Sequence, residues 1–105
     1  MIARVWKCIA TSNHVADYIE HFEHSVSAEL NQIDGYVGAY ILRRNVTDNV
    51  ELTVTTLWES MDVIRKFAGD NVERAVVALR AQQVLETFDS TVTHYEVILK
   101  EGAIP

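Results

Sequence analysis

The stretch Ile2-Ala3-Arg4-Val5-Trp6-Lys7-Cys8-Ile9-Ala10 decides the architecture of this 105-residue chain. It is rich in β-branched and aromatic residues, and both of its alternating sets of side chains are mainly apolar. This pattern is typical of a strand that is buried on both faces. A chain of this length buries only about 60 to 70% of the surface that its unfolded form exposes, so it cannot cover both faces of a sheet by itself.

The rest of the chain supplies helices and strands in a regular order. Apolar side chains at spacings of 4, 3, 4 and 4 predict an amphipathic helix that begins after the capping residues 11–13. The predicted elements are a helix ending near residue 32, strands over 36–44 and 50–58, a short helix over 60–67, a helical run over 70–88, a strand over 91–100 and a tail over 101–105.

Together with the first strand these elements give the order β-α-β-β-α-β, the ferredoxin-like pattern of the α+β class. We expect an antiparallel four-stranded sheet with both helices on one face. The other face then carries large apolar side chains, and an exposed patch of that kind normally marks an interface. The sequence therefore predicts a homodimer that closes sheet against sheet.

Composition narrows the class of protein further. The chain is 49% hydrophobic with a formal net charge of -6 and a single cysteine. These values exclude a disordered chain or a disulfide scaffold, and the negative charge argues against nucleic acid or membrane lipid as a partner. The N-terminus shows no basic leader followed by a long apolar run. We expect one domain over 1–105 in the cytoplasm.

Three segments resemble a known family, the antibiotic biosynthesis monooxygenases. They are Leu57-Trp58-Glu59-Ser60-Met61-Asp62-Val63-Ile64-Arg65-Lys66-Phe67-Ala68-Gly69-Asp70 with the following Glu73-Arg74-Ala75-Val76, the ending Val92-Thr93-His94-Tyr95-Glu96-Val97, and the opening Arg4-Val5-Trp6. The resemblance covers essentially the whole chain and implies a dimeric α/β barrel. It also implies either oxidation of aromatic substrates by molecular oxygen, without metal or flavin, or degradation of haem.

The two activities differ in the side chains they require. In the aromatic-oxidising type an Asn stands four residues before the strand Trp and a Tyr six residues after it; Trp58 matches, but the other two positions hold Val54 and Ile64. In the haem-degrading type an iron-binding His follows an aromatic by ten residues, and the position ten after Phe67 is Val77. Haem degradation is therefore not expected, and we predict oxygenation of a small or polycyclic aromatic substrate of the phenol or hydroquinone type, with no cofactor.

The first and fourth strands are neighbours in this topology, so their polar residues can form one cluster. The sequence predicts His94 as the catalytic base, because imidazole accepts protons near neutral pH. Arg4 would hold the resulting negative charge, with Trp6, Trp58 and Glu96 as further substrate contacts. The alternative is structural: His94 and Glu96 form a hydrogen-bonded pair and Arg4 is their counter-ion at the dimer seam.

Three of the four histidines follow one stripe of the first helix. His14, Asp17, His21 and His24 are spaced by 3, 4 and 3, a spacing that metal ligands can adopt. The stripe lies almost opposite the apolar face, so we expect it to be solvated and to hold no metal. Two functions stay open, the cofactor-free monooxygenase and a non-catalytic ligand-binding or structural homodimer; isomerase or decarboxylase activity rests on fold analogy alone.

Overall fold

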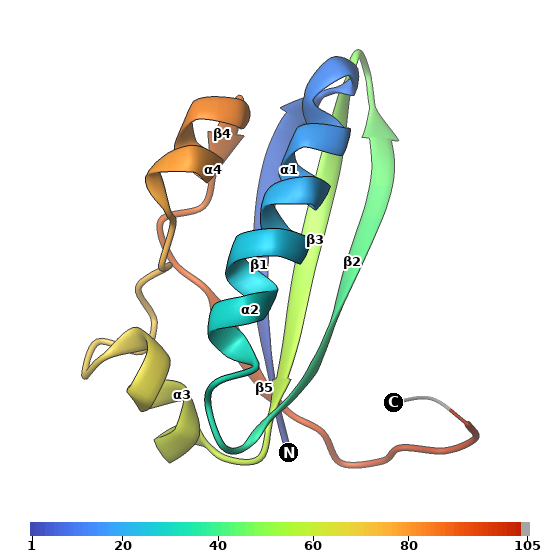
Figure 1. Ribbon diagram of the computed structural model, residues 1–105. Helices are drawn as coiled ribbons and strands as arrows, with labels where there is room; N and C mark the ends of the chain where they lie inside the picture. The colour runs from blue at the N-terminus through green and yellow to red at the C-terminus, as the bar shows by residue number, and fades with distance from the viewer. Residues whose placement is uncertain (104–105) are drawn as a thin grey trace.

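One antiparallel sheet forms the centre of the protein, with strand order β2-β3-β1-β4 and β5 also paired to β1 (Figure 1). The computed structural model describes residues 1–103, so residues 104–105 of the predicted tail lie outside it. The strands are β1 (Ile2–Thr11), β2 (Tyr36–Val46), β3 (Asn49–Trp58), β4 (Thr87–Phe88) and β5 (Thr93–Glu96). This order confirms the predicted ferredoxin-like α+β topology.

The helices lie on one face of this sheet (Figure 1). The first is continuous but changes pitch along its length, through η1 (Ser12–His14), α1 (Val15–His21), the π-helical turn η2 (Phe22–Val26) and α2 (Ser27–Leu30). The others are α3 (Met61–Ala68), whose first turn is capped by the Ser60 hydroxyl, and α4 (Leu79–Val84). Within the described residues, no helix is long and apolar enough to cross a membrane.

The predicted helical run over 70–88 is wrong for most of its length, because only Leu79–Val84 is helical. The backbone of the preceding segment bonds to other parts of the protein instead of to itself. The amide of Ala75 donates to the carbonyl of Ser90 at 2.9 Å, and the amide of Val92 donates to the carbonyl of Glu73 at 2.8 Å. Backbone groups satisfied in this way are not available for a helix.

The predicted strand over 91–100 is present only as β5, and the other short strand, β4, falls within the predicted helical run. β4 and β5 both pair with β1, but residues 90–92 leave the sheet between them and meet the loop at 73–75. β5 is short: the amide of Val97, directly after it, donates to the carbonyl of Met1 at 2.9 Å, and the residues that follow belong to no strand. Ile98 and Leu99 are consequently 90% and 78% exposed.

The two faces of the sheet differ in how they are covered. On the helix side, register pairs such as Cys8 with Leu52 and Ala10 with Val50 are buried and form the core with the helices. On the other side, Leu42 and Tyr95 are 58% and 56% exposed. The single chain thus has the uncovered apolar face that the sequence predicts, and its occupant stays a prediction.

Candidate functional site

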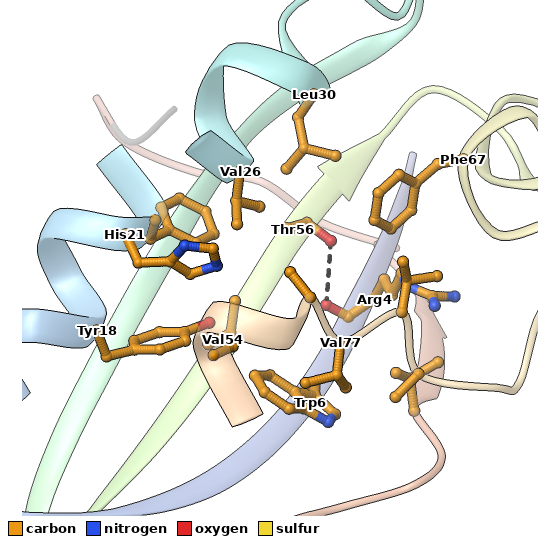
Figure 2. A pocket seen from close by; sticks show the side chains of 16 residues that line it. Arg4, Trp6, Tyr18, His21, Val26, Leu30, Val54, Thr56, Phe67 and Val77 are labelled. Carbon is orange, nitrogen blue, oxygen red and sulfur yellow. Dashed lines mark hydrogen bonds between the residues drawn. The ribbon is translucent and has the colours of Figure 1, made fainter. Parts of the chain in front are cut away.

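A cavity of about 70 Å³ lies between the helical layer and the sheet (Figure 2). The sheet contributes Arg4, Trp6, Val54 and Thr56; the helices contribute Tyr18, His21, Phe22, Val26, Leu30, Phe67 and Ala81; and the loop segments contribute residues 75–78 and Val92. Most of these side chains are apolar. The few polar groups therefore decide what the cavity can bind.

Arg4 forms one end of the cavity and is only 5% exposed. Its Nη1 donates to the carbonyl of Val72 at 2.6 Å, and its Nη2 donates to the carbonyl of Arg74 at 3.0 Å. The guanidinium also lies over the Phe67 ring, 5.9 Å from the centroid. Burial lowers the Arg4 pKa to about 10, so the group stays cationic at neutral pH. Among the described residues no carboxylate pairs with it.

His94 stands directly opposite Arg4 in the β1–β5 register. Its Nε2 lies 3.0 Å from Nη1 of Arg4. A guanidinium can only donate, so Nε2 accepts and the ring proton belongs on Nδ1. Burial and the Arg4 charge lower the His94 pKa, while Glu73 opposes the shift. His94 therefore meets Arg4 as a neutral acceptor, behind the cavity wall.

The predicted hydrogen-bonded pair of His94 and Glu96 does not form in the described part of the chain, so this alternative is wrong. Glu96 is exposed and stands opposite Ile2 at the end of β5. His94 bonds to Arg4 instead, because residues opposite each other in an antiparallel pair lie closer together than residues two apart on one strand.

The two tryptophans predicted as substrate contacts have different positions. Trp6 lines the cavity, and its Nε1 donates to the carbonyl of Asp89 at 2.7 Å. Trp58 is completely buried; its Nε1 donates to the Thr56 hydroxyl at 2.8 Å, and its ring stacks on Phe67 at 5.7 Å. Trp58 therefore supports the cavity wall from behind, whereas Trp6 is part of the wall.

The structure also brings a residue to the cavity that sequence reasoning placed in solvent. His21 is 9% exposed and lines the cavity, so its predicted solvation is wrong, whereas His14 and His24 are exposed as expected. His21 is about 60° around the helix from buried Tyr18, and α4 packs beside this flank. The apolar ring of Tyr18, one turn before His21, was the only local sign that this flank of the helix is buried. The position of α4, which covers the flank, cannot be predicted from local sequence.

The environment of His21 leaves its ring both neutral and unsatisfied. Burial, assisted by the positive charge of Arg80, lowers its pKa. Its Nε2 is buried and has no hydrogen-bond partner in the part of the chain that the structure describes. A buried polar atom without a partner costs about 1–3 kcal/mol. Among the described residues, no three His, Cys, Asp or Glu side chains gather in a way that could hold a metal ion.

These features define a ferredoxin-like α+β protein with a small cavity between helices and sheet. Comparison of the sequence with protein-family models and with curated proteins gives no match. Solved structures do match in fold, and this agreement confirms at the level of the fold the resemblance stated above.

Three such structures cover nearly the whole chain. A Bacillus cereus protein provisionally described as an antibiotic biosynthesis monooxygenase has a TM-score of 0.69 and 15% identity, covering 100% of this chain and 98% of its own. A Deinococcus radiodurans protein with the same provisional description has a TM-score of 0.62 and 14% identity, covering 100% of each chain. The haem degrader MhuD of Mycobacterium tuberculosis, solved with two haems in its active site, has a TM-score of 0.62 and 21% identity, covering 97% of this chain and 100% of its own.

Proposed function

We propose that this protein is a cofactor-independent monooxygenase of phenol-type or hydroquinone-type aromatic compounds, working as a cytoplasmic homodimer. The observation that carries the proposal is the buried Arg4 cation, which faces an apolar cavity and has no carboxylate partner within residues 1–103. A buried charge normally needs a counter-charge. A phenolate formed in the cavity would supply it, and the descriptions of two structural neighbours as monooxygenases agree with this chemistry.

The reaction balances without a protein-bound redox group. Loss of the phenolic proton makes an electron-rich ring that reacts with molecular oxygen. One oxygen atom enters the ring as a new carbonyl and the other leaves as water, so that phenol and O₂ give the quinone and H₂O. All four electrons that reduce the oxygen come from the substrate. In this scheme Arg4 stabilises the developing anion and Trp6 packs against the ring.

His94 has two possible roles in this scheme. The sequence predicts it as the proton acceptor, but its Nε2 already accepts from Arg4. The geometry supports a positioning role, in which His94 holds the guanidinium in place. As the acceptor, His94→Ala abolishes turnover; as a positioning residue, His94→Ala lowers turnover and His94→Gln, which still accepts a hydrogen bond, restores part of it.

Oxygen consumption by the purified protein, measured against a panel of phenols and hydroquinones, tests the proposal. We expect uptake above the buffer rate for at least one compound, and a loss of at least about 100-fold in kcat/KM for Arg4→Met. Arg65→Met is the matched control, since Arg65 is an exposed arginine of α3 that forms a surface ion pair with Asp62. Uptake at the buffer rate with every compound would refute the proposal.

A second candidate is a homodimer that binds a small ligand without catalysis. Two observations favour it: the aromatic-oxidising pattern lacks its two polar partners, with Val54 in the cavity wall and Ile64 fully buried, and the cavity is small. Ligand binding without oxygen uptake in the same panel would select this candidate. Either candidate leaves the uncovered face of the sheet to a second copy of the chain.

A further inference from the structure

His21 is the most polar group on the helical side of the cavity. Figure 2 shows its ring directed from α1 into the cavity, between Tyr18 and Val26. It is nine-tenths buried, yet its Nε2 has no hydrogen-bond partner among residues 1–103. The ring lies directly before the π-helical turn η2, an irregularity that often occurs at functional sites in helices.

We infer that Nε2 of His21 is the hydrogen-bond partner of a hydroxyl group on the ligand, and that this ligand is a single-ring phenol. The inference rests on the proposed function of the cavity and names the compound that the cavity selects. His21 is then the residue that distinguishes a hydroxylated ring from a plain hydrocarbon.

The chemistry of the cavity explains why a hydroxyl fits best. A neutral imidazole has one N–H donor and one acceptor, and a hydroxyl can bond to either. A purely apolar ring leaves Nε2 unpaired. A buried water needs two to four polar partners. The nearby Thr56 hydroxyl is already engaged, because it accepts from Trp58 and donates to the Arg4 carbonyl.

The dimensions of the cavity indicate one ring. Its volume of about 70 Å³ is below the ~150 Å³ of a cavity that holds benzene, so even one ring must displace part of the wall. Residues 75–77 separate the cavity from a groove of about 470 Å³, since they line both. This segment has no regular secondary structure. A polycyclic ligand would require a much larger displacement.

Binding of phenol and of toluene, measured by calorimetry, tests the inference, because the two probes have similar shape and differ in the hydroxyl. For the unmodified protein we expect phenol to bind about 10-fold more tightly than toluene. His21→Phe should remove this preference, and His21→Gln, which keeps a polar group, should retain part of it. His24→Phe is the matched control, since His24 is exposed on the same helix.

Each outcome decides the question. An undiminished phenol preference in His21→Phe overturns the inference, and so does a wild-type protein that binds neither probe. Loss of the preference together with oxygen uptake at the buffer rate keeps the role of His21 and refutes the monooxygenase. Thermal unfolding checks that the variants fold. If His21→Phe does not fold, His21→Gln decides the question: an undiminished preference for phenol, with toluene binding unchanged, overturns the inference.

Discussion

Nη1 of Arg4 lies 3.0 Å from Nε2 of His94, across the pair of strands that joins the two ends of the chain. The same guanidinium donates to the carbonyls of Val72 and Arg74. One buried side chain therefore connects the first strand, the last strand and the irregular loop before α4. Arg4 therefore anchors the loop and also supplies the cation of the proposed reaction.

Replacing Arg4 should loosen that loop as well as impair any reaction. In Arg4→Met the carbonyls of Val72 and Arg74 lose their donors, and we expect the free energy of unfolding to fall by about 2–4 kcal/mol. Urea denaturation measures the change, and hydrogen exchange should rise first in residues 70–78. Arg65→Met should change stability by less than about 0.5 kcal/mol. Equal effects from the two variants would contradict the anchoring role.

Stability should decline as the pH falls below the ordinary histidine pKa. Burial lowers the pKa of both His21 and His94 in the folded protein below the ordinary histidine value. Below about pH 6.5 the two histidines bind protons more readily in the unfolded chain than in the folded protein, so the free energy of unfolding falls. Above this pH both histidines are neutral in either state, and the stability is no longer reduced. Urea midpoints at pH 7.5 and 5.5 should show this loss, and His21→Gln/His94→Gln should reduce it. An identical loss in the double variant would contradict the assignment.

Gly35 should not tolerate a side chain. Its φ of +99° is unfavourable for other residues, and an added Cβ would lie 2.6 Å from Cγ2 of Val63. We expect Gly35→Ala to cost about 1–3 kcal/mol in the free energy of unfolding. Gly69→Ala, with φ +80° but open space around it, isolates the backbone contribution. The clash is supported if Val63→Ala relieves part of the cost of Gly35→Ala and not that of Gly69→Ala.

Trp58 should contribute mainly to stability and to the support of Phe67. It is fully buried, stacks on Phe67 and donates to Thr56. Trp58→Ala should lower the free energy of unfolding by about 3–5 kcal/mol. Trp58→Phe removes only the donor and part of the ring, and should lose less while phenol binding changes little. A large loss of phenol binding in a stable Trp58→Phe protein would instead indicate direct contact with the ligand.

The uncovered face of the sheet should determine the oligomeric state. Leu42 is 58% exposed on this face, and a charge there would be desolvated in a sheet-to-sheet dimer. Light scattering coupled to size exclusion should give a dimer for the unmodified protein and a monomer for Leu42→Glu. Leu79→Glu, a 70% exposed position on α4, should remain dimeric. A monomeric unmodified protein would refute the proposed homodimer.

Strand periodicity and residue type were sufficient to predict the three long strands of the sheet. In β3 every second residue from Val50 to Trp58 is buried against the helices, and this alternation is visible in the sequence, whereas β1 is recognised by its β-branched and aromatic residues. The helical run over 70–88 was predicted wrongly because local capping and apolar spacing say nothing about carbonyls that a distant Arg4 holds in place.

The ferredoxin-like topology, the surplus of apolar surface and the proximity of Arg4 to Trp6 all follow from the sequence. They depend on local spacings, two residues in a strand and three or four in a helix. Which histidine lines the cavity depends on tertiary contacts. His94 is held by the strand opposite it, and His21 is buried because α4 lies beside the first helix. Such contacts join residues about 60 or more positions apart, and no local pattern encodes them.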